Sequence, residues 1–260
     1  MNKELFYAAC EKIIGSEHDR SKGIGTLGEK TLHAVLKNYY EPHEENHEIK
    51  VGRYYADIVG ENGVIEIQTR QFNKLLKKLE NFLEFCDVTV VYPMPALKYV
   101  SWLDMDTGEL SPKRKSPRKY RIYDVFPELY KIKYTLDNPR FHLCLCMLEV
   151  DEVRYLNGWS KDKKKGSTRC DRIPKDIIDE VRFDCVEDYG QFLPDGLPRR
   201  FTSADYAKAC RITKRLAGVG LNLLTYLELV ERVDRLGSSY VYQMKKRAVK
   251  KALQTTDYSI

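Results

Sequence analysis

The stretch that most constrains the fold of this 260-residue chain runs from Tyr54 to Gln68 and reads YYADIVGENGVIEIQ. Its composition is typical of two short β-strands joined by a tight turn. Asn62-Gly63 is a strong hairpin signal, because both central positions of a type I′ turn require positive φ. The sequence therefore predicts a β-hairpin here.

Three polar side chains of this hairpin, Asp57, Glu66 and Gln68, are predicted to share one face. With an Asn62-Gly63 turn Asp57 lies opposite Gln68, whereas a four-residue loop from Gly60 to Gly63 puts Asp57 opposite Glu66. Both registers keep the three side chains together, because strand side chains alternate with period 2. Ile58, Ile65 and Ile67 then fill the other face. Two neighbouring carboxylates repel, and a hard cation such as Mg²⁺, which prefers oxygen ligands, offsets that repulsion.

A helix is predicted before the hairpin, from about Leu27 to Tyr40. Thr26 and Glu29 have the spacing of a capping box, and Leu32, Val35, Leu36 and Tyr39 form an apolar stripe. Glu29 lies at the head of that stripe. It can serve as a cap for the backbone or as an acid directed at the hairpin, and the two roles are compatible.

The remaining elements of the first hundred residues complete a simple order. A strand is predicted over 48–51, an amphipathic helix over 73–85, and a buried strand over 87–92 that Pro93 and Pro95 end. Helix, three strands, helix and strand indicate an α/β or α+β core with a mixed sheet flanked by helices.

These residues resemble the PD-(D/E)XK nuclease superfamily, which has the restriction-endonuclease-like fold. The resemblance covers Thr26 to Pro95 and rests on Glu29 in the first helix, Asp57 in the second strand and Glu66-Ile67-Gln68 in the third. It implies that Asp57 and Glu66 bind Mg²⁺ or Mn²⁺ together with the backbone carbonyl of Ile67, and that Glu29 supports the site.

The main departure from the superfamily pattern is Gln68, which stands where lysine is usual. Lysine at that position helps to orient and deprotonate the attacking water. Glutamine can position a water by hydrogen bonds but supplies no charge. Catalytic residues are therefore expected to be Glu29, Asp57, Glu66 and Gln68.

Basic residues are concentrated in three stretches. Residues 199–251 contain thirteen Lys and Arg against four Asp and Glu, residues 111–121 contain six against none, and residues 158–172 contain six against two. Such segregation of charge favours a polyanionic partner, although lysine-rich loops are also common as solvated surface. The residues predicted to contact phosphates in the middle of the chain are Lys113, Arg114, Lys115, Lys163, Lys164 and Lys165.

The C-terminal stretch from Arg199 to Lys246 resembles a winged helix-turn-helix. The pattern predicts two helices, beginning at Thr202 or Ser203 and at Thr213, followed by strands over 229–233 and 240–244. The resemblance implies groove-facing and wing contacts to DNA from Lys214, Arg215, Asn222, Arg232 and Arg235. A dimerisation or protein-contact role is the alternative, and a homodimer stays open.

The resulting expectation is a metal-dependent nuclease that hydrolyses the phosphodiester bonds of double-stranded DNA. Three segments are predicted: a nuclease-like core over 1–97, an α+β extension over 98–198 and a winged-helix domain over 199–260. The alternative is a catalytically inactive, nuclease-like DNA-binding or regulatory protein. Seven scattered cysteines and apolar runs too short for a membrane span favour a cytoplasmic protein without a membrane partner.

Overall fold

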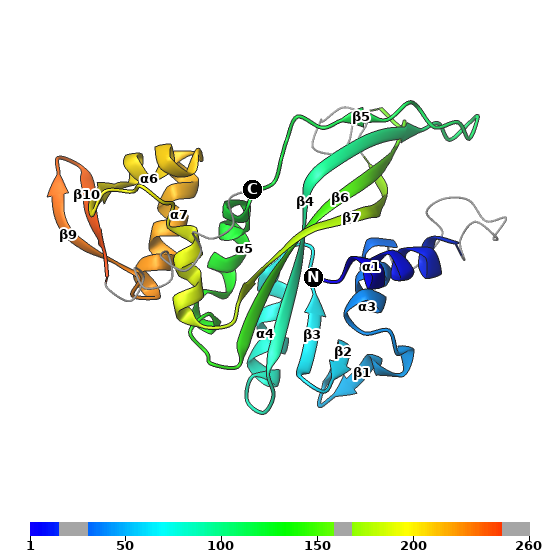
Figure 1. Cartoon of the computed structure of the whole chain (residues 1–260), viewed down its shortest axis with the longest axis horizontal. Coiled ribbons are helices and arrows are strands. Elements are labelled where there is room, and N and C mark those ends of the chain that lie inside the picture. The colour runs from blue at the N-terminus through cyan, green and yellow to red at the C-terminus, as the bar shows by residue number, and fades with distance from the viewer. Residues whose placement is uncertain (16–30, 159–167, 246–260) are drawn as a thin grey trace. The chain divides into compact units, whose positions relative to one another are not determined.

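The computed structural model describes residues 1–15, 31–158 and 168–245 (Figure 1). It divides the chain into two compact units. Unit 1 comprises residues 1–69, 91–120 and 145–181, and unit 2 comprises residues 70–90, 121–144 and 182–260. The predicted segments 1–97, 98–198 and 199–260 stay a prediction about independently folding domains. None of the described helices is both long enough and apolar enough to cross a bilayer.

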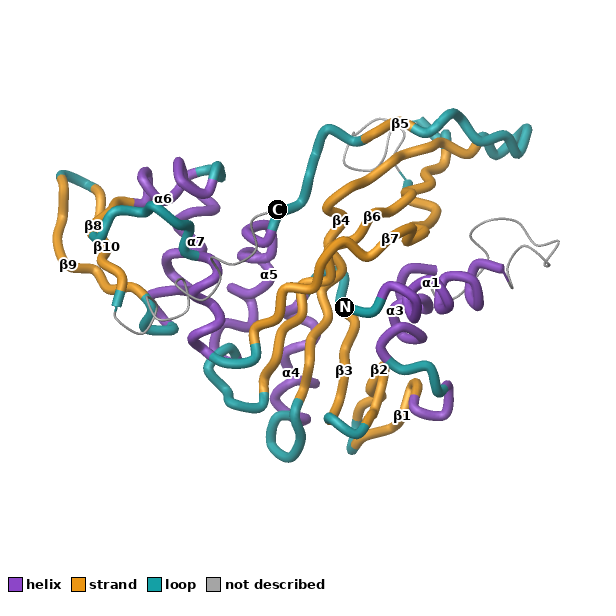
Figure 2. The backbone as a smooth tube through the Cα atoms, viewed as in Figure 1, coloured by secondary structure: helices purple, strands orange, loops and turns teal. Residues whose placement is uncertain are grey.

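The architecture is mixed α/β, built on a seven-stranded mixed sheet with helices. Its strands follow the spatial order β1-β2-β3-β4-β6-β7, and the short β5 pairs with β4. The long strands β4, β6 and β7 are neighbours in that order and contribute residues to both units (Figure 2). The bounds are β1 His47–Val51, β2 Tyr54–Gly60, β3 Gly63–Ile67, β4 Val88–Leu103, β5 Arg114–Lys115, β6 Phe141–Tyr155 and β7 Arg169–Phe183.

The predicted hairpin is β2–β3, but its turn is not the one that the dipeptide Asn62-Gly63 suggested. Gly60 pairs with Gly63, so Glu61 and Asn62 form the two-residue turn. Of the turn residues and their flanks, Gly63 alone has positive φ (97°), and a type I′ turn would require positive φ at both central residues. The register is the one that places Asp57 opposite Glu66.

The helices of unit 1 are α1 (Lys3–Cys10), the π-turn η1 (Glu11–Gly15), α3 (Thr31–Tyr40) and the 3₁₀ turn η2 (Glu44–Asn46). Asn2 caps α1, since its side chain accepts a hydrogen bond from the Leu5 backbone N–H at 3.1 Å. The apolar stripe predicted for α3 is buried, and Phe6 of α1 meets Tyr39 of α3 edge to face. The predicted first turn of this helix, with Thr26 and Glu29, lies outside the described residues.

Strand β4 is far longer than predicted, because Pro93 and Pro95 do not end it. The Val91 carbonyl accepts a hydrogen bond from Gln68 just after β3, and the Lys98 carbonyl accepts one from Ser116 just after β5. The Leu103 carbonyl instead accepts a hydrogen bond from the N–H of Leu156, which follows β6. At residue 91 the backbone carbonyl of an odd-numbered position therefore points toward β3. At residue 98 the carbonyl of an even-numbered position points toward β5, on the same side of β4. The alternation shifts by one residue between them, and such a bulge is where a strand tolerates proline.

The first part of unit 2 is a set of short helices around an aromatic core. The helix predicted over 73–85 is α4 (Phe72–Phe82). Three short helical segments follow later in the chain, η3 (Ile122–Val125), α5 (Phe126–Leu129) and η4 (Tyr130–Thr135). The 3₁₀ segment η5 (Val186–Phe192) follows β7. Phe126, Phe183 and Phe192 are fully or almost fully buried, and the last two stack at 4.9 Å.

The C-terminal elements of unit 2 follow the predicted order. Strand β8 (Arg200–Thr202) leads into α6 (Ser203–Cys210), α7 (Lys214–Tyr226) and the hairpin of β9 (Val230–Leu236) and β10 (Ser239–Met244). These strands form a second sheet in the order β8-β10-β9. Both predicted caps are present, because Thr202 accepts from the Asp205 N–H and Thr213 accepts from the Leu216 N–H.

Gly220 of α7 marks a close approach inside unit 2. A Cβ at this position would lie 2.4 Å from the ring of Phe126. Glycine therefore allows α7 to pack directly against the aromatic core. The buried residues on the same side of the helix are Ala217, Leu221 and Leu224.

Candidate functional site

The side chains of Asp57 and Glu66 each accept a hydrogen bond from the facing strand at the point where β2 and β3 stop pairing. The ladder between the two strands runs from Gly60 and Gly63 to Ile58 and Ile65. At the next position side chains replace backbone partners: Asp57 Oδ2 accepts a hydrogen bond from the Ile67 N–H at 2.7 Å, and Glu66 Oε1 accepts one from the Asp57 N–H at 3.3 Å. The two carboxylates thus bridge the gap between the strands.

Burial distinguishes these two acids. The side chain of Asp57 is 17% exposed, whereas Glu66 is 3% exposed. A carboxylate withdrawn from water is costly unless hydrogen bonds or a positive charge stabilise it. The backbone N–H groups of Asp57 and Ile67 provide part of that stabilisation. Glu66 is therefore held in place by the fold, while Asp57 stays within reach of solvent.

His33 of α3 completes this group, although it was not among the site residues predicted from the sequence. Its Nε2 lies 3.2 Å from Asp57 Oδ2. One helical turn further on, Lys37 is buried and its Nζ lies 2.9 Å from Glu48 Oε1 of β1. Residues i and i+4 share a helix face, so the spacing of His33 and Lys37 is the signal that could have directed attention to this side of α3. We call Asp57, Glu66, Ile67, Gln68 and His33 the Asp57 site.

The other two members of the Asp57 site come from β3 and its end. The backbone N–H of Gln68 donates to the Val91 carbonyl of β4 at 2.9 Å. This hydrogen bond holds the backbone of Gln68 in place, and its side chain is half-buried. Ile67 directs its N–H at Asp57. In an extended strand the N–H and C=O of one residue leave on the same side, so the Ile67 carbonyl also faces β2.

The predicted metal ligands are two carboxylates and one backbone carbonyl. Across the residues described, no cluster of three or more His, Cys, Asp and Glu side chains has the arrangement of a metal site. Asp57, Glu66 and the Ile67 carbonyl contain fewer such side chains than that. Glu29, the fourth predicted catalytic residue, lies outside the described residues.

The basic residues predicted in the middle of the chain are only partly described. Lys113, Arg114 and Lys115 are exposed, and β5 pairs with β4 so that Arg114 lies beside Val100 and Lys115 beside Tyr99. Lys113 also forms an ion pair with Asp151 at 2.5 Å. Lys163, Lys164 and Lys165 lie outside the described residues.

The cationic residues predicted on α7 do not all have the same surroundings. Lys214 and Arg215 are exposed in the first turn of the helix. Asn222 is half-buried, and its Oδ1 accepts a hydrogen bond from Lys133 of η4 at 3.4 Å. The amide oxygen of Asn222 therefore already has a partner within unit 2, and the DNA contacts of Asn222, Lys214 and Arg215 stay predictions.

The predicted wing cations lie together on the β9–β10 hairpin. Arg232 and Arg235 have their guanidinium carbons 4.4 and 4.8 Å from the ring centre of Tyr240, which is itself exposed. Arginine stacked on an exposed aromatic ring combines positive charge with a flat surface, and nucleic-acid-binding proteins use both.

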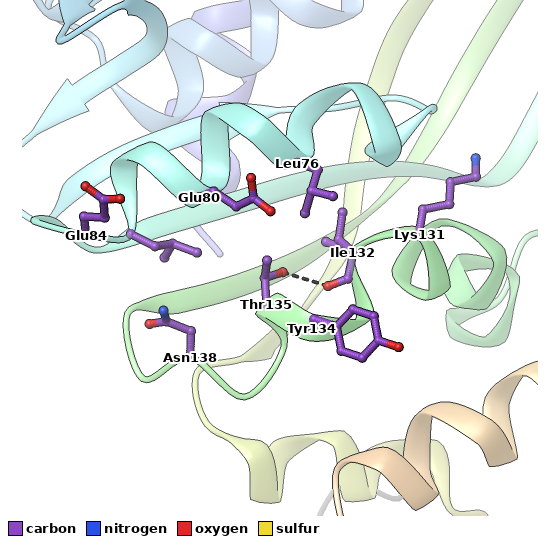
Figure 3. Close-up of a pocket in the computed structure, with 9 residues that line it drawn as sticks. Leu76, Glu80, Glu84, Lys131, Ile132, Tyr134, Thr135 and Asn138 are labelled. Atoms are coloured by element: carbon purple, nitrogen blue, oxygen red, sulfur yellow. Dashed lines mark hydrogen bonds between the residues drawn. The ribbon is translucent and has the colours of Figure 1, made fainter.

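A cavity of about 370 Å³ lies elsewhere, within unit 2 between α4 and η4 (Figure 3). Glu80 of α4 and Glu84, which follows the helix, line one side, and Lys131 and Tyr134 line the other. The Thr135 hydroxyl near it donates to the Ile132 carbonyl at 2.8 Å. None of the residues predicted from the sequence as catalytic or DNA-binding lines this cavity.

Comparison with known proteins shows which family this chain belongs to. A Treponema pallidum (strain Nichols) protein described as "Uncharacterized protein" is 26% identical over 186 residues, which are 71% of this chain and 74% of that protein. No solved structure matches the chain. A family model matches residues 30–184, a range that includes the described members of the Asp57 site and ends before α6 and α7. The chain therefore belongs to the family described as "Domain of unknown function (DUF8091)".

Proposed function

We propose that this protein is a metal-dependent nuclease that hydrolyses DNA phosphodiester bonds at the Asp57 site. The observation that carries the proposal is the convergence of the Asp57 and Glu66 carboxylates at the separated ends of β2 and β3. Convergent carboxylates beside a backbone carbonyl are oxygen ligands, and oxygen ligands suit Mg²⁺ and Mn²⁺. The restriction-endonuclease-like fold is part of the same proposal.

The donor chemistry of the site fits such a cation. Mg²⁺ usually keeps several waters and takes only one or two protein carboxylates, so a complete cage of side chains is not required. Asp57 and Glu66 would hold the ion together with the Ile67 carbonyl. When bound, a divalent cation supplies a Lewis acid and lowers the pKa of its coordinated water.

The other side chains at the Asp57 site orient the water and the metal-binding carboxylates. Gln68 orients a water by hydrogen bonds without adding charge. His33 fixes the orientation of the Asp57 carboxylate through the contact between Nε2 and Oδ2. Glu29 supports the site from the start of the preceding helix. Burial of Glu66 keeps its carboxylate in one position, as a preorganised ligand requires.

Binding of DNA is assigned to the basic elements of both units. In unit 2, the helix pair α6–α7 and the β9–β10 hairpin form a winged helix-turn-helix in which Lys214 and Arg215 contact DNA phosphates and Arg232 and Arg235 form the wing contacts. The stacking of Arg232 and Arg235 on Tyr240 supports that role. In unit 1, Lys113, Arg114 and Lys115 provide further phosphate contacts.

A cleavage assay tests the proposal directly. Supercoiled plasmid and single-stranded DNA are incubated with the full chain and Mg²⁺ or Mn²⁺, and calorimetry measures cation binding in parallel. Asp57→Asn and Glu66→Gln are expected to abolish cleavage and to weaken cation binding by about tenfold or more, because each removes one charged ligand. Glu45→Gln, which removes an exposed carboxylate of unit 1, is the matched control and keeps wild-type activity.

The same assay with Gln68→Lys measures the effect of the departure from the superfamily. Lysine adds the missing charge, so cleavage is expected to increase while cation binding stays similar. The nuclease proposal fails if the wild-type chain neither binds Mg²⁺ or Mn²⁺ nor cleaves either substrate, and Gln68→Lys does not restore cleavage.

The second candidate is a nuclease-like DNA-binding or regulatory protein without catalysis. The observation that favours it is that Asp57 Oδ2 is already occupied by the Ile67 N–H and by His33. In this case both carboxylates serve to join β2 and β3. DNA affinity that decreases steeply with salt and is unchanged by Asp57→Asn, together with absent cleavage, would favour this second function.

A further inference from the structure

A second charged cluster of unit 1 is built around Glu152 of β6, whose side chain is 0% exposed. Four cations from three neighbouring strands contact its carboxylate. Oε1 lies 3.4 Å from Lys98 Nζ and 2.8 Å from Arg154 Nε, and Oε2 lies 3.1 Å from Arg172 Nε and 3.3 Å from Arg169 Nε. We call these five residues the Glu152 cluster. The four cationic side chains are between 11% and 31% exposed, so the carboxylate is enclosed and the cations reach solvent.

The charges of the Glu152 cluster do not balance. One carboxylate faces four cations, so Glu152 by itself offsets one of their four positive charges. The three arginines and one lysine carry about eighteen N–H donors, whereas a carboxylate accepts about four hydrogen bonds. Glu152 can therefore orient the cations without using most of their donor capacity.

Two carboxylates of the described residues lie next to cluster members in the sequence, and both have contacts of their own. Asp151, the preceding residue, contacts Lys113 at 2.5 Å and Lys175 at 3.9 Å. Asp171, beside Arg172 in the sequence, accepts a hydrogen bond from the Thr31 hydroxyl. Both acids thus have partners outside the Glu152 cluster, and Asp171 Oδ1 also accepts a hydrogen bond from the Arg172 backbone N–H at 2.7 Å.

Burial and the opposite charges within the cluster shift the pKa values of its members. Burial raises the pKa of Glu152, but Lys98, Arg154, Arg169 and Arg172 together lower it to about 2. Burial also lowers the pKa of Lys98, and Glu152 opposes that effect. A further anion beside Lys98 would stabilise its protonated form, so the cluster is poised to accept negative charge.

We propose that the Glu152 cluster is a binding site for a phosphate group. Guanidinium groups match phosphate oxygens in a planar, bidentate geometry, and three arginines held by one carboxylate are preorganised for it. Glu152 acts as the positioning residue. The positive charge that Glu152 does not offset is what attracts a dianionic or bridging phosphate in spite of the carboxylate.

The neighbouring strand suggests how such a phosphate could be part of a longer polyanion. The Ser116 N–H donates to the Lys98 carbonyl at 2.8 Å, so the basic segment of β5 runs beside the cluster. Arg114 and Lys115 of that segment are exposed. A nucleic-acid strand would then place one phosphate in the Glu152 cluster and its neighbours on β5. A free phosphate monoester shares the same chemistry, and the experiment separates the two sources.

The inference does not rest on the nuclease proposal, because no residue of the Asp57 site belongs to the Glu152 cluster. Binding is therefore measured on the full chain in the presence of EDTA, which removes any contribution from a divalent cation. The probes are inorganic phosphate, followed by calorimetry, and a short fluorescent DNA duplex with and without a 5′-phosphate, followed by anisotropy at several salt concentrations.

Four variants define the expected result. Arg172→Gln and Arg169→Gln each weaken phosphate or duplex binding by about tenfold, because each removes one charged donor. Glu152→Gln keeps the shape but removes the opposing charge, so it tightens binding by severalfold. Lys12→Gln, which removes an exposed lysine paired with Glu44 in the same unit, leaves binding unchanged. Circular dichroism confirms that each variant is folded, and Arg169, the most exposed cation of the cluster, is the substitution least able to disturb folding.

The outcomes distinguish the source of the phosphate. Effects on the duplex alone identify a nucleic-acid backbone, and effects on inorganic phosphate alone identify a free monoester. Effects on both identify a general phosphate site. The proposal is overturned if folded Arg172→Gln and Arg169→Gln bind both probes as the wild type does, or if neither probe binds the wild-type chain.

Discussion

The Asp57 site and the Glu152 cluster, both within unit 1, solve the problem of a buried carboxylate in opposite ways. At the Asp57 site two carboxylates are stabilised by backbone N–H groups and one histidine. In the Glu152 cluster one carboxylate is surrounded by four cations. The first arrangement offers carboxylate oxygens and suits a cation. The second offers ammonium and guanidinium groups and suits an anion.

The strongest way to break this comparison is to remove Glu152. Glu152→Ala leaves four cations beside one another without a counter-charge, so we expect the free energy of unfolding to fall by about 3–5 kcal/mol. Urea denaturation followed by circular dichroism measures the change. A loss below about 1 kcal/mol would show that the cations rearrange freely, contrary to a preorganised cluster.

The comparison also predicts a dependence on pH that belongs to Glu152. Its pKa of about 2 lies below the ordinary value of 4.5, so its contribution to stability is complete above about pH 4.5 and is lost as the pH falls toward 2. The wild type is expected to exceed Glu152→Gln by about 3 kcal/mol near neutral pH.

That difference should vanish near pH 2, where Glu152 becomes protonated and resembles glutamine. Urea midpoints of both proteins measured from pH 7 to pH 2 provide the test. A difference that stays constant across this range would contradict the assignment of the low pKa to Glu152.

A smaller loss is expected at the Asp57 site. Asp57→Ala removes the acceptor of the Ile67 N–H, so we expect the free energy of unfolding to fall by about 1–3 kcal/mol. Asp57→Asn retains an acceptor oxygen and is expected to lose less. Equal losses for both variants would mean that the charge of Asp57, and not its hydrogen bond to β3, holds the strands together.

The smallest effect is expected for His33. His33→Ala removes one half-buried contact to Asp57, which contributes about 1 kcal/mol. His33→Gln can keep a hydrogen bond and serves as the matched variant. Denaturation midpoints that are identical for the wild type, His33→Ala and His33→Gln would exclude His33 from the support of Asp57.

Local sequence patterns predicted much of the structure around Asp57. Alternation placed Asp57 and Glu66 on one face in both registers, because period 2 does not depend on the turn. The sequence left two registers open, and the pairing of Gly60 with Gly63 selects the one that places Asp57 opposite Glu66. Thr202 and Thr213 marked their helix starts correctly, because capping depends on residues three positions apart.

Features that depend on distant parts of the chain could not be predicted in the same way. The Glu152 cluster combines residues of β4, β6 and β7 that are up to 74 positions apart, and no spacing rule connects them. His33 meets Asp57 only through the packing of α3 beside the sheet. The continuation of β4 past Pro93 depends on neighbouring strands, which single-sequence patterns do not reveal.

The one-residue shift of β4 between Val91 and Lys98 has a consequence for changes in chain length. A single inserted or deleted residue in this interval would move the side chain of each later residue of β4 to the opposite face of the sheet. Lys98 would then exchange its place with a neighbour of opposite orientation, and the Glu152 cluster would lose a cation although no residue of the cluster had been replaced. Pro93 and Pro95 therefore lie in a stretch whose length, more than its composition, determines which face of the sheet each later residue of β4 occupies.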